Sequence, residues 1–330
     1  MKNFIFLLFF ISSTVIAQNC DSLILQTITN PGPYTVSNID ESDGLRDGPN
    51  YSGATIYYPD NNNNLSSIIF VPGYSNTQLT IQNWGPYLAA HGIVTMTIGT
   101  NSLLDSHIQR RDALLDALIT LKEENSRINS PLYNRLDTNR LALGGFSKGG
   151  GGAQLAASIN NEIDAVIALY PWLENITATD LNHSTPVMIV SGELDAIAPP
   201  FLHADVHYNY TPNTTNKLKF EVALAGHDPL SGPYAGLGDV GFKTLSWLKT
   251  YMLEDSCYCP YLLDNPISAS SYITNIICPD LTTVIIDKNI NNRKIINIVD
   301  ILGRKIDIKE SKVLYYIYND GYVEKKIITN

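Results

Sequence analysis

The sequence predicts an α/β fold, with a mostly parallel central sheet covered by helices on both faces, followed by a small all-β unit. From Ala54 onward, short β-rich runs alternate with helix-like stretches. Several of these runs are apolar at consecutive positions, as expected for strands that are covered on both faces. Such alternation is typical of α/β sheets. After about Pro279 only β-like runs remain, and Asn319-Asp320-Gly321 among them is a strong hairpin signal.

The individual elements follow from the local patterns. The runs with strand character are ATIYY, SSIIFV, IVTMTI, RLALGG, DAVIALY, PVMIVSG and KLKFEVA. The stretch SHIQRRDALLDALITLKEEN has apolar residues at near-helical spacing and a candidate N-terminal cap at Ser106. A second helical stretch, DVGFKTLSWLKTYML, follows near the end of the alternation. We therefore expect a large α/β domain over residues 18–280 and a separate β-unit over residues 281–330.

The composition and the N-terminus indicate an exported protein. The 330 residues are 44% hydrophobic and 16% charged, which is ordinary for globular proteins, and the net charge of −10 argues against a nucleic-acid partner. Lys2, the apolar run Phe4–Ile11 and the small residue Ala17 predict a secretory signal peptide over residues 1–17. No other stretch has the length and apolar character of a membrane span.

The cysteines indicate disulfides rather than a metal site. An even number of cysteines in an exported chain suggests a disulfide framework. The four cysteines are Cys20, Cys257, Cys259 and Cys278. A direct bond between Cys257 and Cys259 would be strained, so each is expected to pair elsewhere. The cysteines show no Cys-x-x-Cys spacing, so we expect no zinc or other metal.

The motif most informative about chemistry is Gly145-Phe146-Ser147-Lys148-Gly149. The glycine-rich segment around it fits neither the Walker phosphate loop nor the dinucleotide-binding pattern. A flexible linker would not follow the apolar strand Leu141–Leu143 or precede a helix-like stretch. Gly-x-Ser-x-Gly between a strand and a helix is typical of the nucleophile elbow of α/β-hydrolases. Ser147 is therefore the candidate nucleophile, on a turn too tight for side chains at the flanking positions.

A hydrolase of this fold needs an acid and then a histidine further along the chain, each on a loop after a later strand. Of the six histidines, only His227 directly follows a late strand-like run. Asp195 follows the run that ends at Ser191, and Glu193 is a competing candidate just before it. We expect Ser147, Asp195 and His227 to form a catalytic triad that needs no cofactor.

At these residues the chain resembles polyester-degrading cutinases and poly(ethylene terephthalate) hydrolases. The resemblance covers roughly residues 32–253. It is carried by VPGY at 71–74, WGPYLAAHGIVTMTIGTNSLLD at 84–105, LDTNRLALGGFSKGGGG at 136–152, YPW at 170–172, LDAIAPP at 194–200 and AGH at 225–227.

The resemblance implies roles for individual residues. Ser147 would be the nucleophile, His227 the general base and Asp195 the residue that orients it. The backbone N–H groups of Tyr74 and Lys148 would form the oxyanion hole. The residues implied to line the acyl cleft are Tyr74, Phe146, Lys148, Trp172 and Ile197. Lys148 departs from the family pattern, which usually has Met at this position.

The resemblance also bears on the cysteines. Cys278-Pro279 resembles the C-terminal cysteine of the family, which implies a Cys259–Cys278 disulfide. Cys20–Cys257 is then the second pairing that we expect, among the connectivities that four cysteines allow.

The C-terminal unit resembles a second family. KIINIVDILGRKID followed by LYYIYNDGYVEKKII is similar to type IX secretion sorting domains, which implies that residues 281–330 engage the type IX secretion machinery. The protein would then be secreted or attached to the outer-membrane surface. A binding module for carbohydrate or a polymer surface is the alternative, although most aromatic residues of this unit fall within strand patterns.

Together these features predict a secreted, monomeric serine esterase that hydrolyses carboxylic esters of polyesters through an acyl-enzyme. One alternative is a lipase or a dienelactone-hydrolase-like esterase for small soluble esters. An alternative from another class is a non-catalytic surface adhesin.

Overall fold

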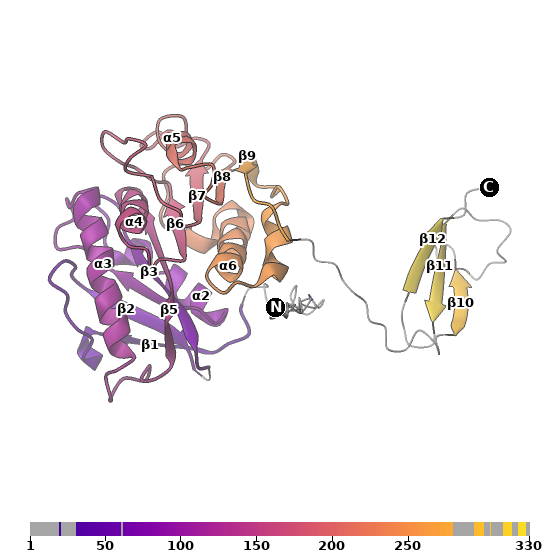
Figure 1. Cartoon of the computed structure of the whole chain (residues 1–330), viewed down its shortest axis with the longest axis horizontal. Helices are drawn as coiled ribbons and strands as arrows, with labels where there is room; N and C mark the ends of the chain where they lie inside the picture. Colours follow the sequence, from indigo (N-terminus) through magenta and orange to yellow (C-terminus); the bar gives the residue numbers. More distant parts are fainter. Residues whose placement is uncertain are drawn as a thin grey trace, which may run out of the picture. The chain divides into compact units, whose positions relative to one another are not determined.

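The computed structural model describes Cys20 and residues 31–60, 62–279, 294–299, 304, 313–318 and 323–327. The chain forms two compact units, residues 1–281 and 282–330 (Figure 1). The predicted signal peptide, the first β-like run after Pro279 (TTVIID, 282–287) and the predicted turn at Asn319–Gly321 lie outside the described residues.

The first unit is built around a nine-stranded sheet in the order β1-β2-β4-β3-β5-β6-β7-β8-β9. The strands from β4 to β8 in this order run parallel to one another, and β1, β2 and β9 pair antiparallel at the two edges. The strand bounds are Val36–Asp40 for β1, Ala54–Pro59 for β2, Leu65–Val71 for β3, Val94–Ile98 for β4, Leu136–Phe146 for β5, Ala165–Leu169 for β6, Val187–Gly192 for β7, Lys217–Val222 for β8 and Ala269–Thr274 for β9.

This arrangement confirms the predicted α/β fold with a mostly parallel sheet. Every strand predicted between Ala54 and Val222 is present, because these runs carry continuous apolar faces that the sheet buries. The two outermost strands, β1 and β9, were not predicted. Their sequences, VSNID and ASSYIT, are half-exposed and contain few apolar residues, so pairing with a neighbouring strand decides their conformation.

Helices cover both faces of the sheet (Figure 1). The apolar residues of α3 (His107–Glu124), α4 (Lys148–Ile159) and α5 (Ala204–Tyr210) belong to one core cluster. Those of α2 (Trp84–Ala90) and α6 (Asp239–Tyr251) belong to a second cluster on the other face. The predicted cap of α3 is confirmed: the Ser106 hydroxyl accepts from the Gln109 amide at 3.3 Å, and the Gln109 side chain accepts from the Ser106 amide at 2.9 Å.

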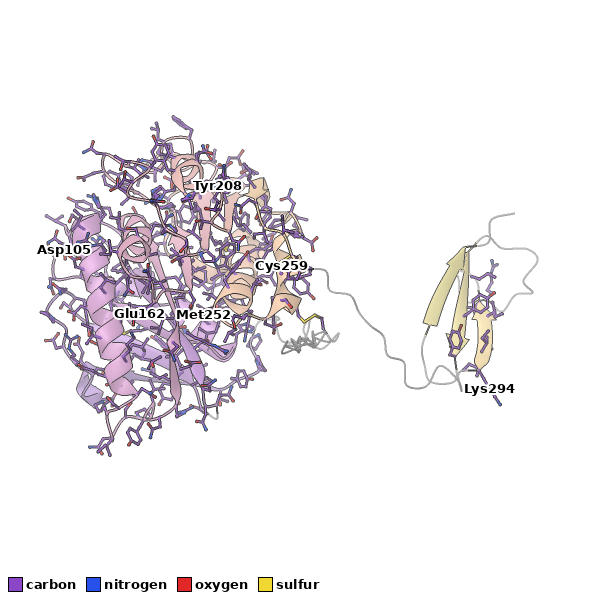
Figure 2. All side chains as sticks on the ribbon, viewed as in Figure 1. Asp105, Glu162, Tyr208, Met252, Cys259 and Lys294 are labelled. Carbon is purple, nitrogen blue, oxygen red and sulfur yellow. A yellow bond between two sulfur atoms is a disulfide. The ribbon has the colours of Figure 1, made fainter. Side chains whose placement is uncertain are left out.

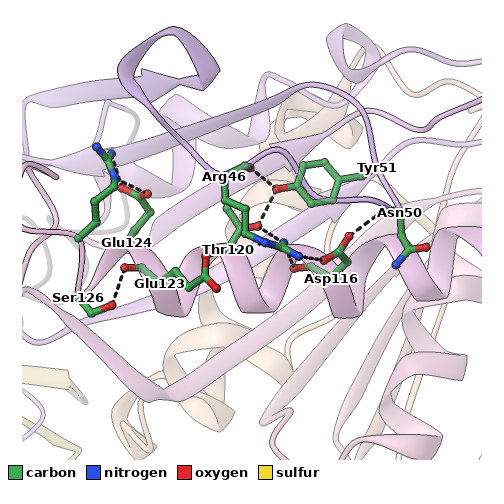
Figure 3. A network of polar contacts seen from close by, with 9 residues as sticks. Arg46, Asn50, Tyr51, Asp116, Thr120, Glu123, Glu124 and Ser126 are labelled. Atoms are coloured by element: carbon green, nitrogen blue, oxygen red, sulfur yellow. Dashed lines mark hydrogen bonds and ion pairs between the residues drawn. The ribbon is translucent and has the colours of Figure 1, made fainter.

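A network of hydrogen bonds and ion pairs connects the loop after β1 to α3 (Figure 3). Arg46 pairs with the buried carboxylate of Asp116 at 2.7 Å and donates to the Thr120 hydroxyl at 2.8 Å. The Asn50 amide donates to the same carboxylate at 2.8 Å, and the Tyr51 hydroxyl donates to the Arg46 carbonyl at 2.9 Å. The buried charge of Asp116 therefore has a cationic and a hydrogen-bonding partner, as a buried carboxylate requires.

Both expected disulfides are present. Cys259 and Cys278 are bonded with their Cα atoms 5.6 Å apart, and Cys20 and Cys257 with theirs 5.3 Å apart. Cys259, labelled in Figure 2, lies in the helical turn Ser256–Leu262, whose apolar residues share a core cluster with α6. The two bonds tie this turn to Cys278, near the end of the first unit, and to Cys20, near the N-terminus.

The second unit contains a three-stranded antiparallel sheet in the order β10-β11-β12. Its strands are Ile295–Val299, Val313–Tyr318 and Val323–Ile327. They coincide with three of the β-like runs of the sequence. The register pairs Ile317 with Val323 and Val313 with Ile327, which fits a hairpin between β11 and β12.

A buried polar network lies beneath α4 and α5. The His183 Nδ1 donates to the Thr185 carbonyl at 2.9 Å, and its Nε2 faces the Gln154 amide nitrogen at 3.4 Å. This arrangement suits a neutral imidazole with the proton on Nδ1. Burial lowers the pKa of His183 to about 4 and that of the fully buried His207 to about 3. Both rings are therefore neutral in the folded protein over the physiological range.

These buried histidines should make the protein acid-sensitive. Because the folded-state pKa of each lies below the ordinary value of 6.5, the unfolded chain binds more protons than the folded one at intermediate pH. The free energy of unfolding should therefore fall as pH decreases from about 6.5 to about 4, with His183 contributing about 2–3 kcal/mol. The free energy of unfolding can be measured by urea denaturation of the wild type and of His183→Gln between pH 6.5 and 4, and its pH dependence tests this prediction. An unchanged pH slope in the variant would contradict this assignment.

Candidate active site

The candidate nucleophile lies on a strained turn between β5 and α4. Ser147 has φ 54° and ψ −119°, a conformation that non-glycine residues rarely adopt. The turn is held by three backbone hydrogen bonds. The Ser147 amide donates to the Leu169 carbonyl at 2.8 Å, and the Ser147 carbonyl accepts from Gly151 at 3.1 Å and from Trp172 at 3.0 Å. The surrounding backbone therefore imposes the conformation and keeps the Ser147 side chain at the carboxyl end of the sheet.

The two glycines of the motif are required by close backbone approach. A Cβ atom on Gly145 would lie 2.4 Å from the Gly149 carbonyl, and one on Gly149 would lie 2.5 Å from the Val71 carbonyl. Both distances are far below van der Waals contact. The sequence expectation of a turn too tight for flanking side chains therefore agrees with the geometry of β5, α4 and the end of β3.

Asp195 and His227, which are distant in sequence, lie in direct contact. The His227 Nδ1 is 2.6 Å from the Asp195 Oδ2, and the Asp195 side chain is fully buried. The other carboxylate oxygen, Oδ1, accepts from the backbone amides of Ile197 at 2.9 Å and Ala198 at 2.7 Å. Asp195 therefore fixes the orientation of the imidazole and favours the tautomer with the proton on Nδ1.

Backbone contacts between the loops after β7 and β8 bring these two residues together. The Leu194 amide donates to the Ala225 carbonyl at 2.8 Å, and the Glu193 amide donates to the Val222 carbonyl at 3.0 Å. The Glu193 carboxylate in turn accepts from the Leu224 amide at 2.8 Å. The competing acid of the sequence analysis thus joins the two loops, whereas Asp195 contacts His227.

The hydrogen bonds to Asp195 outweigh its burial. Burial alone would raise the pKa of Asp195, but the hydrogen bond from His227 and those from the Ala198 and Ile197 amides lower it below its ordinary value. Asp195 is therefore ionised whenever the protein is in its working range near neutral pH. A carboxylate in this state stabilises positive charge on the adjacent imidazole.

Phe146 differs from its expected place. Its ring is 2% exposed, and it packs against the His227 ring at 4.7 Å between centroids and the Tyr170 ring at 5.5 Å. Tyr170 also contacts His227 edge-on at 5.9 Å. Phe146 was expected to line the acyl cleft, but its burial leaves it no open face. Phe146 is the last residue of β5, and its ring belongs to the apolar core cluster that also contains Tyr170. This ring packs against one side of the His227 imidazole.

Three backbone segments meet at Ser147. A Cβ atom on Gly73 would lie 2.9 Å from the Ser147 Cβ, so the turn after β3 that carries Tyr74 passes beside the serine. Lys148 is the first residue of α4, and its N–H is one of those that a helix leaves without an intrahelical partner. The Trp172 amide is hydrogen-bonded to Ser147 itself. The expected oxyanion donors, Tyr74 and Lys148, are therefore both next to the serine.

The rim around Ser147 is aromatic and carries one cation. Tyr74 is 44% exposed and Ile197 is 66% exposed. The Lys148 Nζ lies 4.5 Å from the centroid of the Tyr74 ring and 4.6 Å from that of Trp172. Three residues that the sequence analysis missed complete the site: Tyr170, Glu174 and His203. His203 stacks on Trp172 at 5.7 Å, and Glu174 pairs with Lys148 at 3.1 Å.

Among the described residues, no group of three or more His, Cys, Asp or Glu side chains is arranged to hold a metal ion. None of the helices in the described ranges is both long enough and apolar enough to cross a membrane.

A serine on a strained strand–helix turn and an imidazole held by a buried carboxylate are features of α/β-hydrolases, and the Phe146 ring, next to Ser147 in sequence, contacts this imidazole. Comparison with known proteins gives the family. The family described as PETase, PET hydrolase-like, matches residues 23–278. The cutinase est1 of Thermobifida alba is 36% identical over 238 residues, which are 71% of this chain and 76% of that protein.

Two further relatives extend this comparison. The cutinase cut1 of Thermobifida fusca is 34% identical over 71% of this chain and 70% of its own length. A bis(hydroxyethyl) terephthalate hydrolase of Streptomyces coelicolor is 33% identical over 71% of this chain and 73% of its own length. The chain belongs to the PET hydrolase-like family, and it is a carboxylic ester hydrolase.

The contacts of the two acids predict opposite outcomes for their amides. Asp195→Asn should reduce ester turnover by at least about 10³-fold, because the amide no longer holds the imidazole in the required tautomer. Glu193→Gln should change turnover little, because glutamine keeps an oxygen that can accept from the Leu224 amide. Kinetics on a soluble nitrophenyl ester measure both. A larger loss in Glu193→Gln than in Asp195→Asn would reverse the assignment.

Proposed function

We propose that this protein is a secreted serine esterase that hydrolyses the carboxylic ester bonds of polyesters with Ser147, His227 and Asp195. The observation that carries the proposal is the His227–Asp195 contact of 2.6 Å, whose imidazole packs against Phe146, the residue before Ser147 on the strained turn. In this role Ser147 attacks the ester carbonyl, and His227 takes its proton. His227 then gives that proton to the leaving alcohol, and water releases the acid from the acyl-enzyme.

The oxyanion hole would be formed by the backbone N–H groups of Tyr74 and Lys148. The positions of these two residues support this role, because Gly73, which precedes Tyr74, and the first turn of α4 both lie against Ser147. The N-terminus of α4 also has a favourable potential for a developing negative charge. The acyl group would lie on the rim formed by Tyr74, Trp172 and Ile197, and Lys148 projects over the same rim.

The assignment of polyesters rests on the relatives and on this open rim. The relatives include cutinases and a bis(hydroxyethyl) terephthalate hydrolase. Tyr74 and Ile197 are exposed, and a polymer chain at a solid surface requires an accessible cleft. A lipase or dienelactone-hydrolase-like esterase for small soluble esters is the alternative within the same chemistry. Release of soluble acid from solid polyester film supports the polyester hydrolase, and activity on soluble esters alone supports the small-ester enzyme.

Export is the second part of the proposal. The signal peptide at residues 1–17 and the sorting domain at residues 281–330 would direct the protein through the type IX secretion machinery to the cell surface or the medium. Two disulfides fit an oxidising extracellular environment. We expect the enzyme to act as a monomer without a cofactor.

The proposed nucleophile is tested by substitution and labelling. Ser147→Ala should reduce ester turnover by at least about 10³-fold, as the loss of a triad serine does in other hydrolases. A serine-directed phosphonate should label the wild type at Ser147 and leave the variant unlabelled, as mass spectrometry of peptides reads out. Substrates should range from short nitrophenyl esters to polyester film. Full turnover by the variant would exclude the serine mechanism, and a catalytically inert wild type would favour the adhesin.

The role of the second unit is tested by truncation. The two units are separately compact, so a chain that ends at Asp280 should keep its kinetics on a soluble ester. The same truncation should abolish export across the outer membrane in a host with type IX secretion. Activity in the culture medium and in cell fractions measures the two effects separately. A folded truncation that loses most of its turnover would place the β-unit in the catalytic site.

A further inference from the structure

The side chain of Lys148 lies over the two rings that the acyl group would contact. Its Nζ is 4.5 Å from the centroid of Tyr74 and 4.6 Å from that of Trp172, which are cation–π distances to both rings. Although Lys148 stands on the catalytic rim, its side chain is only 15% exposed. The ammonium is thus largely covered by the two aromatic residues and by Glu174.

Glu174 holds the ammonium in this place. Its Oε1 lies 3.1 Å from the Lys148 Nζ, and its own side chain is 53% exposed. Glu174 follows Trp172 in the same loop, and the Trp172 amide is hydrogen-bonded to the Ser147 carbonyl. The nucleophile turn, the Trp172 ring, the ammonium and the carboxylate are therefore connected through one short segment of chain.

An aromatic acyl group would compete with this ammonium. Aromatic rings pack favourably with centroids about 4.5–7 Å apart. An aromatic acyl group that used the same faces of Tyr74 and Trp172 would need the space in which the Nζ lies. An aliphatic acyl chain is narrower and gains little from ring stacking, so it can bind while Lys148 stays in place.

We propose that Lys148 is a specificity-determining residue that disfavours aromatic acyl groups, and that Glu174 is the positioning residue that keeps its ammonium over Tyr74 and Trp172. The inference rests on the proposed function of the same site. It assigns aliphatic esters as the preferred substrate class of the wild-type enzyme. Aromatic acyl groups bind only when the ammonium moves off the two rings.

The test compares two neutral esters with the same small leaving group, methyl butanoate and methyl benzoate, by acid release in a pH-stat. The readout is the benzoate-to-butanoate ratio of kcat/KM, in which a general loss of catalysis cancels. Lys148→Met should raise this ratio at least about fivefold, because it removes two cation–π contacts that the aromatic substrate must otherwise displace. Glu174→Gln should raise it about twofold, as expected for a partly exposed ion pair. Glu174→Asp should restore a ratio nearer that of the wild type.

Two controls separate positioning from general surface charge. Lys122, on α3, and Glu162, in the loop after the C-terminal end of α4, form another exposed ion pair at 2.9 Å, at the opposite end of α4 from Ser147. Lys122→Met and Glu162→Gln should leave the ratio unchanged. Added salt should raise the ratio in the wild type by weakening the Lys148–Glu174 pair, and it should have no effect on the ratio in Lys148→Met. If Lys148→Met fails to fold, Glu174→Gln and the salt series decide the question.

The outcomes distinguish this inference from the proposed function. Loss of butanoate hydrolysis in Ser147→Ala supports the esterase, and the ratio then tests Lys148 alone. An esterase whose ratio is the same in the wild type, Lys148→Met and Glu174→Gln would overturn the inference and leave the function intact. Butanoate hydrolysis that persists in Ser147→Ala would overturn the proposed function itself.

Discussion

The backbone turn at Ser147 is the constraint on which the rest of the site depends. A residue with a side chain adopts positive φ there, at an energetic cost of about 1–3 kcal/mol, because β5 and α4 hold it from both sides. The turn is possible only because Gly145 and Gly149 let the strand, the helix and the end of β3 approach within contact distance. Its carbonyl also anchors Trp172, so the position of the acyl rim follows from the same turn.

The charges of the site are arranged around a second constraint, the burial of Asp195. A buried carboxylate is stable only when its oxygens are hydrogen-bonded, and those of Asp195 are satisfied by two backbone amides and by His227. Glu193 and the backbone join the two loops that carry these residues, so the pair does not rely on its own hydrogen bond for its geometry. The geometry of the Asp195–His227 pair thus depends on contacts between the loops after β7 and β8.

The residues of the rim are held in place by weaker contacts than the buried Asp195–His227 pair. Lys148 contacts both Tyr74 and Trp172 through cation–π contacts that are individually weak, and its partner Glu174 is partly exposed. Such contacts can be displaced by a substrate, whereas the Asp195–His227 pair cannot. The buried Asp195–His227 pair is therefore held by backbone and side-chain hydrogen bonds, whereas the Lys148 ammonium is held by two rings and one partly exposed carboxylate.

The sequence by itself determined the central strands, the capped helix α3, the Gly-x-Ser-x-Gly turn and the order of serine, acid and histidine, because periodicity, caps and tight turns are local. Family resemblance added the disulfide pairing. The sequence already favoured Asp195 over Glu193, and the structure shows Asp195 in contact with His227. Only the tertiary structure decided that Phe146 is buried against the imidazole and that Glu174 pairs with Lys148 beside two rings. It also decided the edge strands β1 and β9. These features depend on which segments meet in space, and neither residue type nor spacing along the chain specifies that.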